Sequence, residues 1–442
     1  MSLRRKVKRV NVISLGCSKN LVDSERLMRM LENVGYDVVH EAEDSRKGDI
    51  VVINTCGFIG DAKEESINEI LARTALRAEG RIEAVYVMGC LSERYGEELR
   101  TEIPEVDGWY GKLSWPQLVT DLSRRHPASA PYDRIITTPR HHAYLKISEG
   151  CNRFCAFCAI PLITGRHRSR PIEEIVDEVK MLVARGVKEF NVIAQELTYY
   201  GIDLYGHRRI AELIDAIAAV DGVEWIRLHY AYPADFPMEM LDAMARNPKV
   251  CRYLDIALQH ISDRVLTNMR RHITAGQTRS LLAEIRRRVP GIRIRTTLMV
   301  GFPGEEEEDF EELMDFVREQ RFDRMGAFAY CEEEDTRAAA DFSDSIPDEV
   351  KQQRLERLMA LQEEISAELM AAQIGSKVRV IIDREEDDYY VGRTEYDSPE
   401  VDPEVLVEKT AALTPGDMIE VEVTDALPFE LIARPVTPAK TI

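Results

Sequence analysis

The stretch AYLKISEGCNRFCAFC, residues 143–158, places Cys151, Cys155 and Cys158 directly after a short run with strand character. The run AYLKIS predicts a buried β-strand, and the cysteines follow it with CxxxCxxC spacing. Three thiolates within eight residues can hold three corners of an iron–sulfur cubane and leave the fourth iron open. A structural zinc site usually takes four ligands from two separated pairs. A zinc site or a redox-active loop is the alternative interpretation of this spacing.

Strand-like runs continue at regular intervals on the carboxyl side of this loop. They read FNVIAQ, WIRLHY, YLDIAL, RIRTTLMV and DRMGAFAY, with helical spacing between them in segments such as 172–185, 209–220 and 305–320. Together with AYLKIS they make six strand–helix alternations. This number is typical of an incomplete (β/α) barrel, shorter than the eight-fold version.

Three further cysteines, Cys17, Cys56 and Cys90, each end an apolar run near the start of the chain. The runs read VNVISLGC, DIVVINTC and AVYVMGC, and segments with helical spacing lie between them, which predicts an open parallel α/β sheet. Because the carboxyl ends of parallel strands share one edge of a sheet, we expect the three thiols to converge. One cysteine at a strand end is more often a small buried hydrophobe, but three in succession favour a second cluster with an open iron.

The last part of the chain changes character. Residues 347–374 are predicted to form one amphipathic helix that starts after Pro347 and ends before Gly375. Short strands separated by turn residues follow over 376–442 and predict a small OB-like β-barrel. The segment SRRHPASAPYDR, residues 123–134, is typical of a linker. We therefore predict an α/β protein with three domains, at 1–130, 131–375 and 376–442.

Composition limits the environment and the partners of the chain. The 442 residues include 58 basic and 78 acidic side chains, and the net charge of -20 disfavours non-specific nucleic-acid binding. No apolar run approaches the roughly 18 residues of a spanning helix, and we expect a cytoplasmic protein. Eight cysteines are too sparse for a disulfide scaffold. Cys251 and Cys331 follow no pattern and are expected to be packing residues.

Taken together, the motifs resemble those of the methylthiotransferases of the radical S-adenosylmethionine superfamily. They read SLGCSKNLVDSE, INTCGFI, MGCLSERY, SEGCNRFCAFCAIP and MVGFPGE, and the terminal strands resemble a TRAM domain. The similarity covers nearly the whole chain. It implies two 4Fe–4S clusters, one on each cysteine trio, and S-adenosylmethionine as a cofactor that is split to a 5′-deoxyadenosyl radical. It also implies that the second cluster carries the sulfur to be inserted and that the clusters and S-adenosylmethionine carry the chemistry.

The resemblance also implies contacts to S-adenosylmethionine. Phe157 precedes the last cysteine of the loop, and Gln195 and Glu196 occupy the place of the segment that receives the methionine amine. A polar strand cap is the alternative for this pair. Arg295 could pair with the methionine carboxylate or form a structural salt bridge. Gly301 would shape a tight turn next to the adenine or serve as a turn alone.

The charge of the terminal segment favours a protein substrate over RNA. Residues 374–442 hold 16 acidic and 7 basic side chains, so their net charge is -9. RNA-reading barrels need cationic groups, whereas an acidic barrel attracts a basic protein. Within the family, this favours the branch that modifies the β-carbon of an aspartate of ribosomal protein S-twelve, met free or on the small subunit. Modification of isopentenyladenosine in tRNA is the alternative, and a two-cluster electron carrier is a third.

Overall fold

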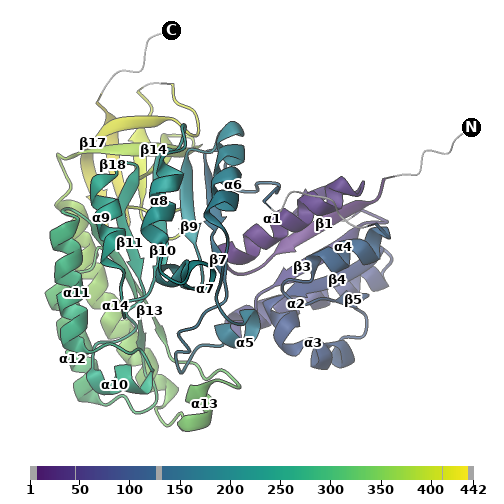
Figure 1. The fold of residues 1–442 in the computed structure, drawn as a ribbon, viewed down its shortest axis with the longest axis horizontal. Helices are drawn as coiled ribbons and strands as arrows, with labels where there is room; N and C mark the ends of the chain where they lie inside the picture. The colour runs from purple at the N-terminus through teal and green to yellow at the C-terminus, as the bar shows by residue number, and fades with distance from the viewer. Residues whose placement is uncertain (1–6, 45, 126–131, 411, 437–442) are drawn as a thin grey trace, which may run out of the picture. The chain divides into compact units, whose positions relative to one another are not determined.

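A computed structural model describes residues 7–44, 46–125, 132–410 and 412–436 (Figure 1). In its described residues the chain divides into two compact units. The first comprises Met1–Thr138, Tyr144–Asn152 and Cys158–Glu178, and the second comprises Pro139–Ala143, Arg153–Phe157 and Val179–Ile442. The three-domain boundaries at residues 130 and 375 remain a prediction. Each helix in the described part of the chain is too short or too polar to span a lipid bilayer.

The first unit contains the predicted open parallel sheet, which is confirmed. Its strands run in the order β2 (Asp37–His40), β1 (Arg9–Ser14), β3 (Ile50–Thr55), β4 (Ala84–Gly89) and β5 (Gly108–Trp109), with parallel pairing throughout. Alternate residues of the central strands enter opposite cores, so that Val10 and Val52 face one layer and Val51 and Ile53 the other. A sheet buried on both faces explains the continuous apolar runs.

Helices cover both faces of this sheet. The core on one face takes side chains from α1 (Ser18–Asn33) and α4 (Trp115–Ser123), and the core on the other takes them from α2 (Gly60–Ala78) and α3 (Cys90–Glu102). Each of α1, α2 and α3 follows a strand after a few residues at most, so the cysteine-bearing turns lie where strands end and helices begin.

The predicted linker ends in an ordered, buried contact. Residues 126–131 of this segment lie outside the described residues. Arg134 is almost completely buried, and its guanidinium pairs with Glu178 at 2.7 Å and with Glu25. The composition of the segment indicates a linker, but two buried carboxylates far away in the sequence hold its last basic residue in place.

Six strands form the second sheet, as the alternating pattern predicts. Their order is β13 (Arg324–Ala329), β12 (Arg293–Val300), β11 (Val250–Ile256), β10 (Trp225–Ala231), β9 (Glu189–Ile193) and β6 (His142–Lys146). The connecting helices are α6 (Ile172–Ala184), α8 (Ile210–Ala218), α9 (Met238–Arg246), α11 (Ala275–Arg288) and α12 (Glu307–Gln320). The order of these six strands in the sheet follows their order in the sequence, and β9 to β13 pair in parallel. This is the partial six-stranded (β/α) arrangement.

The chain ends in a long helix and a closed barrel. Helix α14 (Asp348–Ala371) matches the predicted helix and starts after Pro347. The barrel strands are β14 (Lys377–Glu385), β15 (Tyr389–Thr394), β16 (Glu404–Glu408), β18 (Glu430–Pro435) and β17 (Met418–Leu427), in spatial order. Met370 of α14 packs in the barrel core. The predicted small β-barrel is therefore confirmed (yellow in Figure 1).

Candidate metal centres

Three strand ends of the first unit bring Cys17, Cys56 and Cys90 to one edge of the sheet. Strand β3 pairs with β1 on one side and with β4 on the other, and the register sets Ser14 opposite Asn54 and Thr55 opposite Gly89. Each cysteine follows the last residue of its strand within three positions. Equal register at the strand ends therefore places the three thiols at one level.

Two glycines allow these strand ends to approach closely. A Cβ on Gly16 would lie 2.7 Å from the Cβ of Cys56 and 2.9 Å from its sulfur. A Cβ on Gly89 would lie 2.5 Å from the backbone oxygen of Thr55, and both glycines have positive φ. Side chains larger than glycine at either place would force the strand ends, and their cysteines, apart.

The electrostatic surroundings of the three thiols differ. Burial raises the pKa of the Cys56 thiol, and it raises the pKa of Cys90 to about 12. Displacement of water by surrounding atoms would raise the pKa of Cys17 as well. The net effect is nevertheless a lowered pKa, because the ammonium groups of Lys19 and Lys112 and nearby backbone N–H donors stabilise the thiolate more strongly. Negative charge on Cys17 in turn contributes to the raised pKa of the other two thiols, which places all three within electrostatic reach of one another.

A buried lysine that the sequence analysis missed stands behind this trio. Lys112 Nζ donates to Asp23 at 3.1 Å and to Asn20 Oδ1 at 3.5 Å, and Asn20 Oδ1 also lies 3.6 Å from the Cys90 sulfur. Burial would lower the pKa of Lys112, but Asp23 and Glu149 outweigh it, so its ammonium stays charged. The sequence shows Lys112 only as an isolated lysine after an aromatic strand, and no further signal indicates its role.

Within the first unit, the strand-end trio adjoins the segment that follows the CxxxCxxC loop. Cys90 packs in one buried cluster with Ala159 and Ile163. Ala159 directly follows Cys158, and Ile163 belongs to the short helix α5 (Ile160–Thr164). The two cysteine motifs, 61 residues apart between Cys90 and Cys151 in sequence, therefore have neighbouring surroundings.

The CxxxCxxC loop is held by contacts at each end. The Cys151 N–H donates to the carbonyl of Gly165 at 3.2 Å in the first unit. In the second unit the Cys155 sulfur accepts from Arg271 Nη1 at 3.2 Å and lies 3.8 Å from Tyr232 Oη. Arg271 and Tyr232 therefore position the Cys155 sulfur within the loop.

Glu196 is occupied by protein groups, and this contact reveals a loop arginine that the sequence analysis missed. Its carboxylate accepts from Arg153 Nε at 3.1 Å and from the Thr198 N–H at 2.6 Å. Arg153 lies between the first two cysteines of the loop, and its guanidinium stacks 4.3 Å from the ring centre of Tyr232. Glu196 therefore holds the cysteine loop at the end of β9, and Gln195 precedes it there.

Phe157 and Gly301 lie at the carboxyl ends of the second unit's strands. Phe157 packs edge-on against Phe302, with 6.5 Å between ring centres. Gly301 follows β12 with a positive φ, its N–H donates to Glu305 at 2.9 Å, and a Cβ on it would lie 2.4 Å from the Lys351 side chain. Glycine is required at this turn by the approach of Lys351.

Arg295 lies near the other end of β12. Its Nη1 pairs with Asp402 at 2.6 Å, and Asp402 also accepts from the Tyr253 hydroxyl at 2.8 Å and from the Ser398 N–H. Arg295 therefore forms a salt bridge within the protein, which is one of its two predicted roles; the other is pairing with the methionine carboxylate. We leave it out of the proposed cofactor site.

The strand-end trio fits an iron–sulfur cluster better than a single zinc ion. Among the described residues, one group alone brings three ligand atoms within 4.8 Å of one another, namely His141, His142 and Asp383. The sulfurs of Cys17, Cys56 and Cys90 are therefore more widely spaced than zinc would require with bonds of about 2.3 Å. Three thiols without a fourth protein ligand suit a cluster with an open iron.

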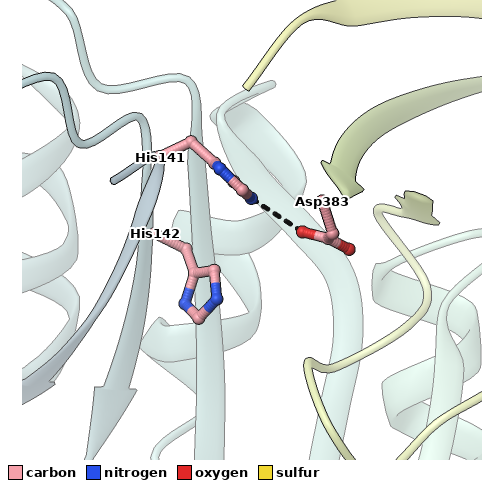
Figure 2. Close-up of side chains that lie close together, drawn as sticks. All are labelled: His141, His142 and Asp383. Carbon is pink, nitrogen blue, oxygen red and sulfur yellow. Dashed lines mark hydrogen bonds and ion pairs between the residues drawn. The ribbon is translucent and has the colours of Figure 1, made fainter. Parts of the chain in front are cut away.

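The histidine group is an ionic anchor rather than a metal site (Figure 2). His141 Nε2 lies 2.7 Å from Asp383, but Arg393 also donates to both oxygens of that carboxylate, at 2.7 and 2.8 Å. Arg393 further binds Glu189 through two hydrogen bonds of 3.0 and 2.8 Å. Burial and the charge of Arg393 lower the pKa of His142 to about 4. Because Arg393 already neutralises the Asp383 carboxylate, that carboxylate has little charge left to attract a metal cation.

Comparison with family models assigns three parts of the chain. The model of the radical SAM superfamily matches residues 145–317, that of the uncharacterized protein family UPF0004 matches 9–111, and that of the TRAM domain matches 374–436. These ranges contain the cysteine loop, the strand-end trio and the closed barrel, respectively.

Curated relatives match almost end to end. A protein of Phocaeicola vulgatus named "Ribosomal protein uS12 methylthiotransferase RimO" is 60% identical over 96% of this chain and 98% of its own length. A Flavobacterium johnsoniae protein of the same name is 51% identical, covering 97% and 98%.

Solved structures share the fold. The radical S-adenosylmethionine methyltransferase TsrM from Kitasatospora setae matches with a TM-score of 0.59 at 17% identity, over 76% of this chain and 78% of TsrM. OxsB, a cobalamin-dependent S-adenosylmethionine radical enzyme, matches with a TM-score of 0.52 at 13% identity, over 81% of this chain and 56% of OxsB.

Proposed function

This chain belongs to the family of ribosomal protein uS12 methylthiotransferases named RimO, and on that premise we propose that it inserts a methylthio group at the β-carbon of an aspartate of ribosomal protein S-twelve. One observation of the structure supports this proposal most. Three cysteines converge at adjacent strand ends, and one of them, Cys90, packs against the segment that follows the CxxxCxxC loop.

We assign one 4Fe–4S cluster to each trio. Cys151, Cys155 and Cys158 would hold the cluster of the radical SAM superfamily, and the strand-end trio would hold a second one. When bound, the clusters and S-adenosylmethionine supply hydrogen abstraction from an unactivated carbon and the sulfur that is inserted. The chain must therefore provide thiolates, orient the cofactor and exclude water.

Side chains of the second unit orient the cysteine loop. The Arg153–Glu196 pair holds the loop at the end of β9, and Arg271 donates a hydrogen bond to the Cys155 sulfur. We propose that Gln195 receives the methionine amine and that Glu196 acts through Arg153. Phe157 and Gly301 complete the proposed S-adenosylmethionine site at the carboxyl ends of the strands.

Protein is favoured over RNA as the substrate by the exposed charge of the barrel. Some of its acids are used internally, since Asp397 and Asp402 pair with arginines of the six-stranded sheet. The end of β14 and the turn before β15 nevertheless expose four consecutive acids, residues 385–388. Glu385 and Glu386 pair with Lys409 and Arg384, whereas Asp387 and Asp388 form no ion pair with the described residues. These carboxylates would repel a phosphate backbone and attract a basic ribosomal protein.

Anaerobic reconstitution tests the cluster assignment. The wild type is expected to bind about eight irons and eight sulfides per chain, and Cys90→Ser about four, because one cubane site loses a ligand. Cys251→Ser is the matched control, since Cys251 is buried in the core of Trp225 and Tyr253 in the second unit and belongs to neither trio. Equal iron in wild type and Cys90→Ser would contradict the second cluster.

Substrate assays separate the three functions. The reconstituted enzyme, supplied with S-adenosylmethionine and a strong reductant, is incubated with S-twelve, with its target-loop peptide and with isopentenylated tRNA. We expect 5′-deoxyadenosine and a mass gain on the protein and the peptide. A mass gain confined to tRNA would support the alternative substrate, and no 5′-deoxyadenosine would favour the electron carrier.

A further inference from the structure

A groove of about 470 Å³ lies in the second unit, where α14 meets the C-terminal barrel. Its walls come from one face of α14, from the first residues of β12 and β13, and from two barrel segments, the loop 401–403 and the turn at Phe429. The proposed cofactor site uses none of these elements except β12, whose opposite end it occupies.

Apolar side chains stand exposed around this groove. Val401 is 59% exposed, Phe429 58% and Met359 38%, and all three line the groove. Scattered exposed apolar residues are ordinary, but three converging on one hollow are typical of a binding surface.

Among the described residues, the charged side chains of the groove that form no ion pair are negative. Arg295 and Arg324 pair with Asp402 and Asp397, each at 2.6 Å. Glu356 and Glu363, both exposed on α14, take part in no ion pair of the described residues. They lie seven residues apart, which is two helical turns and about 10 Å. The same spacing separates residues i and i+3 of an extended peptide.

The groove is remote from the chemistry. Arg295, which lines the groove, precedes Gly301 by six residues of strand and turn, which corresponds to about 20 Å. Cys155 lies with Tyr232 and Arg271 beyond the carboxyl ends of the strands. A molecule in the groove therefore touches no reacting atom and can contribute to binding alone.

We propose that this groove binds a lysine- and arginine-rich segment of the protein substrate, with one apolar side chain of that segment seated against Phe429 and Val401. The inference rests on the proposed function and adds a second contact outside the active site. Two uncompensated carboxylates around an apolar hollow suit a basic peptide and repel RNA. Because the groove recognises a segment other than the modified loop, it increases the affinity for full-length S-twelve but not the affinity for the isolated loop peptide.

Reversal of the two carboxylates tests the proposal. Glu356→Lys/Glu363→Lys is expected to raise KM for full-length S-twelve about tenfold, since two attractions become repulsions, while kcat stays within about twofold. Phe429→Ser should raise the same KM. The matched control, Glu349→Lys/Glu364→Lys, carries the same charge change on the same helix outside the groove lining and should leave KM close to that of the wild type.

The loop peptide and a binding measurement complete the test. The peptide should be modified equally by wild type and groove variants, and the Kd of the reconstituted, unreduced enzyme for S-twelve should weaken with KM. The proposal would be overturned if the groove variants left the Kd for S-twelve unchanged, if they lost turnover of the peptide, or if the control pair had an equal effect. It would also be overturned if rRNA competed with S-twelve for the wild type more strongly than for the lysine variant. Absence of turnover by the wild type would overturn the proposed function, while the Kd comparison would still decide the groove.

Discussion

Replacement of Arg393 by methionine is the most informative test of how the C-terminal barrel is held on the six-stranded sheet. Arg393 is fully enclosed and makes four hydrogen bonds of 2.7 to 3.0 Å to the carboxylates of Glu189 and Asp383. Without it, Glu189 retains Arg227 at 3.1 Å, and Asp383 retains His141. Breaking a buried ion pair costs about 3–5 kcal/mol, and the remaining partners favour the lower figure, about 3 kcal/mol.

The loss should depend on pH. Burial would raise the pKa of Glu189 and Asp383, but Arg393 outweighs it and lowers both. Carboxylates with lowered pKa add stability above their unfolded pKa of about 4 and lose this contribution as the pH falls. The free-energy difference between wild type and Arg393→Met should therefore be largest near neutral pH, persist down to about pH 5 and shrink as the pH falls below about 4.

Denaturant titration of the metal-free protein, with calorimetry, measures the effect. A loss of about 3 kcal/mol corresponds to a Tm lowered by roughly 6–12 °C. Arg379→Met is the control, because Arg379 joins the same two parts through an ion pair with Glu224 that is half exposed on both sides, and should cost under about 1 kcal/mol. Equal losses for the two variants, or a loss for Arg393→Met without pH dependence, would refute this reasoning.

Three further predictions concern single side chains. The Glu196→Gln variant should still bind about eight irons per chain. It should form 5′-deoxyadenosine about tenfold more slowly, because a neutral amide holds Arg153 less firmly than a carboxylate does. An unchanged rate would contradict the proposed role of Glu196. In the metal-free protein near neutral pH, iodoacetamide should modify Cys17, whose pKa is lowered, well before Cys251, whose pKa burial raises to about 12, and peptide mass mapping shows the order. Burial lowers the pKa of His142 to about 4, so the folded state should lose about 3 kcal/mol as the pH falls from about 6.5 to 4, and His142→Gln should flatten that slope in denaturation curves.

The strand pattern and the cysteine positions were predictable because their signals are local. Runs such as DIVVINTC bury alternate residues on two faces, so that Val52 and Val51 enter different cores, and a cysteine after each run must lie at a strand end. Parallel pairing then places Cys17, Cys56 and Cys90 at one edge without any further information. The same reasoning yields the six-stranded sheet and the closed barrel, since apolar periodicity is a property of short windows.

The partners of the charged residues were not predictable. Arg295 lies in a strand with an apolar pattern, and its carboxylate partner, Asp402, comes 107 positions later in a barrel loop. Arg134, in an expected linker, is buried by Glu25 and Glu178. Every arginine is equally able to pair with any carboxylate, so the sequence carries no signal for the choice. Which pairs form depends on how separate elements dock, because a buried charge is stable only where packing brings an opposite charge within hydrogen-bond distance.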